Sequence, residues 1–299
     1  MISRIRKKID RVWFNFRCSG IYKTQPVKCD PDSNIMIVSQ LHHPDMTMYM
    51  LAMKSFTRFV RPRSFVIVDD GLLPEDRRIL SEHFGSIRFV YSKDVQLGAC
   101  PAGGTWERLL TLSQENRDCY VIQLDADTLT LSEPMEVLQC LAQNRSFTLG
   151  TSSGRKPVGL SEASHFGLKS TSNHIQAHAE RAFASYPSHE HLRYVRGCSG
   201  FTGFAKGQLL PEKIQEFSTQ MEKLVGKAKW REWGSEQVTS NFMAANALDS
   251  LVLPVDRYPF WEPDMGIAKA VFVHFFGVFR FMGGMYTQQA LQVIRQLSS

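Results

Sequence analysis

Two carboxylates separated by one residue are the part of the sequence best suited to chemistry. Asp125-Ala-Asp127 directly follows the apolar run Tyr120-Val-Ile-Gln-Leu124. Two carboxylates at the end of a strand can share one divalent cation, and their hard oxygen ligands suit Mg²⁺ or Mn²⁺, which bridge phosphate oxygens. Alone, the tripeptide is typical of a solvated turn. Because a buried strand precedes it, the pair predicts a metal site.

The elements that must position this pair are strands alternating with helices. Apolar runs at 35–38, 64–69, 87–91 and 120–124 lack polar alternation and are separated by helical patterns. This predicts a Rossmann-like α/β fold, with a mostly parallel central sheet flanked by helices. Ligands bind at the carboxyl ends of the strands in such sheets. The polar residues expected at those ends are Ser39, Asp69, Asp70, Asp125 and Asp127.

Later segments have fewer clear signals. Helical patterns are found at 74–84, 106–115, 212–225 and 236–248. The Gly/Ser-rich stretch 150–172 and the glycine-rich stretch 197–207 predict loops around a site, because clustered small residues favour turns.

Composition and charge limit the classes of protein. The chain has 299 residues, with 43% hydrophobic and 21% charged, which excludes disordered, collagen-like and coiled-coil classes. Six basic residues and one acidic residue give residues 1–17 a charge of +5, so only +1 of the formal +6 belongs to the remainder. A basic surface over the whole protein is therefore excluded, and nucleic acid is not an expected partner.

Residues 1–17 also have helical periodicity. Apolar residues recur every three or four positions between basic ones: Ile2, Ile5, Ile9, Val12, Trp13 and Phe16. Either this helix lies on an anionic membrane surface with Trp13 and Phe16 inserted, or it packs as an ordinary surface helix. The N-terminus lacks a secretory signal pattern, and six scattered cysteines fit a reducing compartment. We expect a cytoplasmic protein, or one peripheral on the cytosolic face of a membrane.

The order and spacing of these segments resemble the GT-A superfamily of nucleotide-sugar-dependent glycosyltransferases, whose signature is a metal-binding Asp-x-Asp after a sheet strand. Residues 35–39 look like the first strand of that family, 66–71 like its acidic nucleotide-binding turn, and 106–112 like the helix before its metal strand. The resemblance spans residues 34–290. It implies a GT-A-like fold, a nucleoside-diphosphate sugar donor, and a nucleoside held by Asp70 with Ser39 and Asp69.

The segment Val273-His274-Phe-Phe-Gly277-Val-Phe-Arg280 resembles the C-terminal His-Phe-x-Gly-x-x-Lys segment of the glycogenin-like and lipopolysaccharide galactosyltransferase-like retaining families. This resemblance implies His274 as the third metal ligand, Gly277 in the donor-binding segment and Arg280 as a cation for the diphosphate. An imidazole beside two carboxylates favours Mn²⁺ over Mg²⁺. Arg replaces Lys here, and Phe281-Met282 stands where those families usually have Pro-Trp. A hydrogen-bonded core histidine is the alternative for His274.

Trp233-Gly-Ser-Glu236-Gln237 resembles the acidic-Gln acceptor-side segment of the retaining families, and also the general-base carboxylate of inverting members. Glu236 can deprotonate an acceptor hydroxyl, or orient the acceptor and stabilise positive charge at the anomeric carbon; Gln237 is the second catalytic candidate. The alternative is a helix capping box. Arg108 is a candidate contact for the sugar or diphosphate, because a guanidinium matches phosphate oxygens.

Together the resemblances imply a metal-dependent glycosyltransferase of hexosyltransferase type, acting in polysaccharide biosynthesis. It would transfer a sugar from the donor to a hydroxyl of a glycan or glycolipid acceptor, with retention of configuration. We expect a basic arm and linker over 1–33 and one GT-A-like domain over 34–299, with a donor and metal half at 34–150 and an acceptor half at 151–299. Three alternatives remain: an inverting transferase with Glu236 as base, a haloacid-dehalogenase-like phosphatase, whose acidic motifs would be in the wrong order, and a non-catalytic membrane-peripheral binding protein.

Overall fold

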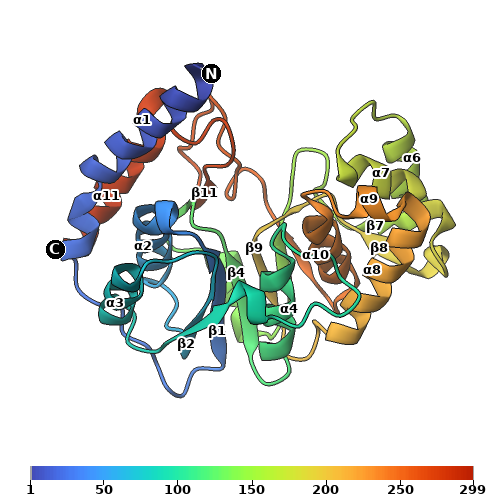
Figure 1. Cartoon of the computed structure of the whole chain (residues 1–299), viewed down its shortest axis with the longest axis horizontal. Helices are drawn as coiled ribbons and strands as arrows, with labels where there is room; N and C mark the ends of the chain where they lie inside the picture. Colours follow the sequence, from blue (N-terminus) through green and yellow to red (C-terminus); the bar gives the residue numbers. More distant parts are fainter. Residues whose placement is uncertain (1, 299) are drawn as a thin grey trace. The chain divides into compact units, whose positions relative to one another are not determined.

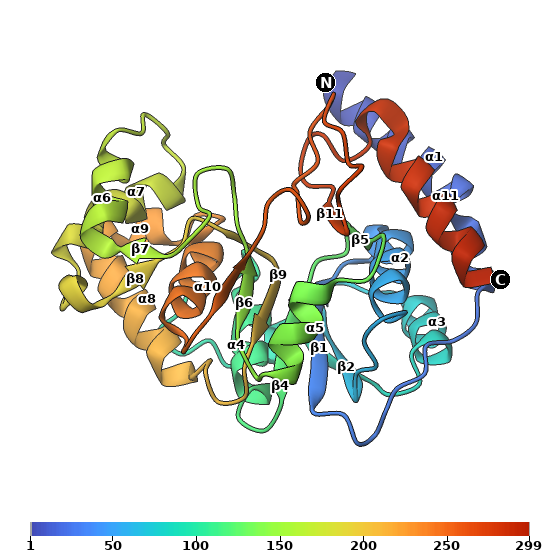
Figure 2. The same ribbon diagram turned by 180° about the vertical axis from the view of Figure 1, so that it is seen from behind.

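A seven-stranded, mostly parallel sheet with the strand order β10-β6-β9-β4-β1-β2-β3 is the centre of the fold (Figure 1, Figure 2). The computed structural model describes residues 2–298, and the side chains of residues 8–298. Helices flank the sheet, so the predicted α/β fold class is confirmed.

The strands and helices agree closely with the predicted positions in the first half of the chain. The strands are β1 (Ile35–Leu41), β2 (Ser64–Asp69), β3 (Ile87–Tyr91), β4 (Tyr120–Leu124), β5 (Thr128–Thr130), β6 (Phe147–Leu149), β7 (Val158–Gly159), β8 (Arg193–Tyr194), β9 (Cys198–Phe204), β10 (Leu251–Leu253) and β11 (Phe272–His274). The α-helices are α1 (Ile2–Arg17), α2 (Met46–Phe56), α3 (Pro74–His83), α4 (Trp106–Glu115), α5 (Met135–Ala142), α6 (Leu160–Leu168), α7 (Ile175–Ala182), α8 (Pro211–Val225), α9 (Lys227–Trp230), α10 (Ser235–Asn246) and α11 (Met285–Ser298).

Contacts divide the chain into two compact units. The first unit contains Met1–Phe89, Leu124–Leu138 and Val255–Ser299, and the second contains Val90–Gln123 and Gln139–Pro254. The expected halves, 34–150 for donor and metal and 151–299 for the acceptor, remain a prediction about function.

In the first unit, β1 pairs in parallel with β2, from Met36 opposite Ser64 to Leu41 opposite Asp69. All eleven residues of α2 are buried, which explains why its sequence is apolar around most of its circumference. A second, antiparallel pair joins β11 to β5 and places His274 opposite Thr128. This short pair brings the C-terminal part of the chain to the segment that follows β4.

In the second unit, the prediction of a loop over 197–207 is wrong, because residues 198–204 form the buried strand β9. Gly203 serves close packing between strands, whereas Gly207, with φ of +74°, lies in a turn. Gly203 is opposite Phe147 of β6, and a Cβ on Gly203 would lie 2.3 Å from the Phe147 ring. The predicted loop over 150–172 is wrong in part, since it contains α6.

Glu180 of α7 is a buried carboxylate in the second unit, and it predicts a pH-dependent stability. It is 2% exposed, and its Oε2 lies 2.8 Å from Arg196 Nη1. Burial raises the pKa of Glu180 to about 7, although Arg196 opposes the shift. The unfolded value is about 4.3. The contribution of protonated Glu180 to the free energy of unfolding is therefore fully present below about pH 4.3, and it is lost as the pH rises through about 7.

We therefore compare the wild type with Glu180→Gln, which cannot titrate. The free energy of unfolding of the wild type, minus that of the variant, should fall by about 3 kcal/mol between pH 4.5 and pH 8. Urea unfolding at several pH values in this range measures the difference. A difference that stays constant with pH would contradict the raised pKa.

Candidate functional site

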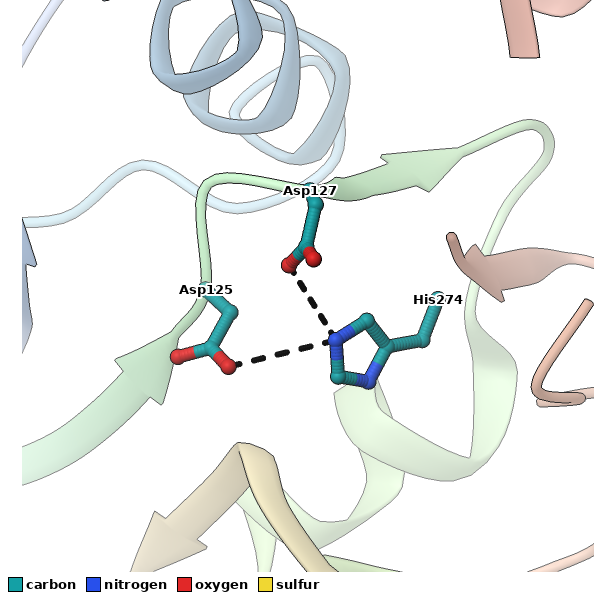
Figure 3. Close-up of side chains that lie close together, drawn as sticks. All are labelled: Asp125, Asp127 and His274. Atoms are coloured by element: carbon teal, nitrogen blue, oxygen red, sulfur yellow. Dashed lines mark hydrogen bonds and ion pairs between the residues drawn. The ribbon is translucent and has the colours of Figure 1, made fainter. Parts of the chain in front are cut away.

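Three potential metal ligands meet at the carboxyl end of β4, all within the first unit. Asp125 and Asp127 follow β4, and His274 is the last residue of β11; Figure 3 shows their side chains pointing toward one another. One ligand atom from each lies within 4.8 Å of the others. His274 Nε2 is 3.1 Å from Asp127 Oδ1 and 3.9 Å from Asp125 Oδ2.

Backbone contacts hold these ligands in place. The Phe275 amide donates to the Asp127 carbonyl at 2.8 Å, next to the β5–β11 pair. The Thr128 hydroxyl donates to the Asp125 carbonyl at 2.9 Å. The Ser39 hydroxyl, at the end of β1, donates to the Leu124 carbonyl at 2.7 Å. The turn between β4 and β5 is thus fixed by hydrogen bonds from Ser39 of β1 and from Phe275, which follows β11.

The distances from His274 to the two carboxylates fit a divalent cation. Ligand atoms bound at about 2.1 Å to one octahedral ion are about 3.0 Å apart when adjacent and about 4.2 Å apart when opposite. The His274-to-carboxylate distances of 3.1 and 3.9 Å fall between these limits. Two carboxylates and one imidazole form a donor set suited to Mn²⁺, while Mg²⁺ prefers oxygen alone.

Asp127 is the electrostatic centre of this group. It is 7% exposed, its Oδ1 accepts a hydrogen bond from His274, and its Oδ2 accepts one from Arg280 Nη2. Burial raises the pKa of the Asp127 carboxyl, but His274 and Arg280 outweigh burial and hold this pKa below its usual value. The carboxylate is therefore ionised throughout the neutral range.

The loop after β11 brings Arg280 to Asp127. Gly277 has φ of +59°, in the left-handed region that glycine adopts without steric cost. Arg280 Nε then donates back to the Phe275 carbonyl at 3.2 Å. The structure thereby places Arg280, for which the family resemblance implied a diphosphate contact, directly beside the Asp127 carboxylate.

The acidic turn after β2 contains the residues expected to hold the nucleoside. Asp69 is 5% exposed; its Oδ1 accepts from the amides of Gly71 and Leu72 at 3.1 and 2.8 Å, and its Oδ2 pairs with Arg77. Asp70 is exposed and accepts from Gln40 Nε2 at 3.2 Å. Asp69 therefore shapes the turn, and Asp70 presents its carboxylate to solvent.

A second polar cluster lies in the second unit around Glu236, in the first turn of α10. Glu236 is 2% exposed, and its Oε2 accepts from the Thr105 hydroxyl at 2.9 Å and the Ser199 hydroxyl at 3.2 Å. Arg108 Nη2 of α4 is 3.6 Å from the same oxygen, and Arg108 is 4% exposed. The structure thus joins two predicted site residues, Glu236 and Arg108, in one buried ion pair. Gln237 is half-buried beside them.

The helix capping box considered for this segment does not form. Gly234, which has no side chain, is the N-cap of α10, and the Ser235 hydroxyl accepts a hydrogen bond from Trp106 Nε1 at 2.9 Å. Sequence reasoning missed Thr105 and Ser199 as partners of Glu236. Thr105 follows two glycines and has φ of +73°, so the Gly-Gly-Thr turn before α4 was the available signal.

Comparison with known proteins identifies the fold. Neither a protein-family model nor a curated protein matches the sequence. Among the solved structures that are similar to this chain, two glycosyltransferases cover most of its length. The bifunctional glycosyltransferase WbbM has 15% sequence identity and a TM-score of 0.51, over 88% of this chain and 52% of that one. The galactosyltransferase LgtC, in complex with donor and acceptor sugar analogs, has 12% identity and a TM-score of 0.50, over 88% of this chain and 96% of that one.

These similarities show that the chain has the fold of the GT-A glycosyltransferases, as the resemblance predicted. The chain spans about half the length of WbbM. At these levels of identity the likeness concerns the fold, so activity must be argued from the site itself.

Proposed function

We propose that the protein is a metal-dependent glycosyltransferase of hexosyltransferase type, transferring a sugar from a nucleoside-diphosphate sugar to a hydroxyl of a glycan or glycolipid. The observation that carries this proposal is the group of Asp125, Asp127 and His274 after β4, with Arg280 beside it, in a GT-A fold. LgtC, which shares the fold, is a galactosyltransferase with donor and acceptor sugar analogs bound. The proposed reaction would be a step in the synthesis of a polysaccharide or a glycolipid.

The leaving diphosphate determines what the first unit must supply. Negative charge develops on the diphosphate as the bond to the anomeric carbon breaks. Asp125, Asp127 and His274 would hold Mn²⁺, or Mg²⁺, which when bound neutralises that charge. Arg280 adds a guanidinium that can bind two phosphate oxygens at once. Gly277 permits the loop that carries Arg280.

The nucleoside would lie against the turn after β2. Asp70, at the end of that strand, presents an exposed carboxylate to a ribose hydroxyl or a base. Ser39 and Asp69 position the site, since Ser39 holds the Leu124 carbonyl and Asp69 holds the turn. We assign donor binding to these three residues together with Arg280.

On the acceptor side we assign Glu236 and Gln237 as catalytic residues, with Arg108 as the buried cation that holds Glu236. Glu236 is almost fully buried, and its Oε2 already accepts two hydroxyl hydrogen bonds. That environment suits a fixed negative charge, which orients the acceptor and stabilises positive charge at the anomeric carbon, better than a base that must meet a mobile hydroxyl. We therefore prefer retention; the alternative is inversion with Glu236 as the general base.

The location of the protein is part of the proposal. Among the described helices, none combines the length and the apolar character needed to cross a membrane. We propose a cytoplasmic protein that is peripheral on the cytosolic face of a membrane through residues 1–17. Its partners would be the sugar donor, the glycan or glycolipid acceptor and an anionic membrane surface, without nucleic acid.

A panel of nucleotide sugars tests the enzyme proposal. We expect one UDP-, GDP- or dTDP-linked sugar to bind in the presence of Mn²⁺, and to bind at least about tenfold more weakly after metal removal. A CMP-linked sugar, which has a single phosphate, should not bind. Calorimetry measures binding, and release of the nucleoside diphosphate measures donor cleavage. If no donor binds and Mn²⁺ changes nothing, the proposal is wrong and the non-catalytic alternative gains support.

A further inference from the structure

The outer face of α1 carries an apolar surface that the transferase function does not use. Four large side chains on one face of the helix, within two turns, are exposed by 55 to 70%: Ile9 62%, Val12 69%, Trp13 55% and Phe16 70%. We call these four residues the apolar stripe. Helices α1 and α11 lie side by side in both views (Figure 1, Figure 2), and the side chains of the stripe remain largely exposed beside that contact.

The opposite face of α1 anchors the helix to the first unit. Phe14 is 1% exposed, and its ring centroid is 4.4 Å from that of Tyr286 and 5.2 Å from that of Phe281. Arg11 forms an ion pair with Asp45 at 3.3 Å. The helix therefore packs on the first unit through one face, as the second interpretation expected, while four of the five apolar side chains described in α1 are exposed. Membrane binding stays a prediction.

The surface around the apolar stripe combines shallow hollows with cationic side chains. Lys8 and the four stripe residues line one hollow of about 450 Å³. Trp13 also borders a neighbouring groove of about 440 Å³, whose polar lining is Asp10, Arg17, Thr287 and Gln288. Arg17 lies over the Trp13 ring, 5.6 Å from its centroid. Apolar side chains beside cationic ones are the pattern of helices that lie in a membrane surface.

The positive charge of residues 1–17 distinguishes between two binding partners of the apolar stripe, a second copy of the helix and a lipid surface. Residues 1–17 carry +5 by sequence; the side chains of residues 1–7, among them Ile2, Ile5, Arg4, Arg6 and Lys7, lie outside the described residues. A second copy of α1 would bring the same positive charge against the first, which is unfavourable. Anionic lipid headgroups attract that charge, while acyl chains accept the apolar stripe. We propose that the apolar stripe inserts into the surface of an anionic bilayer.

This docking would place the donor site near the lipid. Phe281, on which α1 packs, directly follows Arg280, the residue paired with Asp127. The membrane-bound helix is thus joined to the segment that carries the diphosphate cation. This inference deepens the membrane location given under the proposed function, and its consequence for a glycolipid acceptor rests on that function. Vesicle binding can be measured without sugar transfer, so the two can fail separately.

Sedimentation of the full chain with vesicles tests the inference. The probes are phosphatidylcholine vesicles with and without about 30% phosphatidylglycerol. We expect the protein to bind the anionic vesicles at least about tenfold more strongly, and this preference to weaken in high salt. The double variant Val12→Glu/Phe16→Glu should lose at least about tenfold in binding, because it places charge on the inserted face.

The matched control is Phe166→Glu/Leu248→Glu, which changes two exposed apolar residues of the second unit, 51% and 78% exposed. It should bind vesicles as the wild type does. Equal vesicle binding by the stripe variant, or no preference for anionic vesicles, overturns the inference. Light scattering that shows a dimer dissociated by the stripe variant also overturns it, in favour of a second copy. Unchanged calorimetric donor binding in the stripe variant separates lipid binding from the transferase proposal.

Discussion

Replacing Asp127 with Asn is expected to lower metal-dependent sugar transfer by about 10³-fold or more. The amide keeps the size of the side chain but removes a charge from the metal group, and it leaves Arg280 beside a neutral partner. Both changes weaken neutralisation of the departing diphosphate. No effect of this size would follow if His274 and Asp127 were only a hydrogen-bonded pair in the core.

Three measurements separate a metal role from a structural one. Calorimetric titration with Mn²⁺ should show tight binding to the wild type and at least about tenfold weaker binding to Asp127→Asn. Thermal unfolding shows whether the variant is folded. Asp118→Asn, which changes an exposed carboxylate before β4, is the control and should behave as the wild type. Wild-type Mn²⁺ affinity and turnover in Asp127→Asn would refute the assigned ligands.

Glu236→Gln is the second change with a large expected effect, a loss of about 10²-fold or more in kcat with little change in donor binding. The variant keeps the shape of the side chain but removes the charge paired with Arg108 at 3.6 Å. A buried guanidinium without its carboxylate is costly, so a fall in melting temperature should accompany the loss. Glu216→Gln, in an exposed ion pair on α8, is the matched control and should change neither quantity.

The stereochemistry of the product distinguishes the two roles of Glu236. Under the retaining proposal, the anomeric configuration of the donor sugar is kept in the product. Under the inverting alternative, the configuration is reversed, and the acidic limb of the kcat/KM pH profile disappears in Glu236→Gln because that limb reports the base. Nuclear magnetic resonance of the glycosylated product decides between them. Full activity of Glu236→Gln would exclude both roles.

The first half of the fold was readable from the sequence because its signals are local. Uninterrupted apolar runs predicted β1, β2 and β4, the last two of them ending in carboxylates, and the structure confirms these strands at Ile35–Leu41, Ser64–Asp69 and Tyr120–Leu124. The α/β class and the carboxylates at the strand end followed from the same runs. The glycine-rich segment at β9 misled the prediction, since Gly203 is needed for contact with Phe147 rather than for a turn.

The sequence by itself determined the Asp125-Ala-Asp127 pair and the amphipathic pattern of α1, because neighbours in the chain encode both. A family resemblance implied His274 as a partner of this pair, but only the tertiary structure gives the contact, which places His274, 147 residues after Asp127, 3.1 Å from it. The tertiary structure also decided that Arg108 pairs with Glu236 and that the apolar stripe of α1 faces outward. Periodicity specifies which face of an element is apolar, but partners distant in sequence are chosen by the packing of the whole chain.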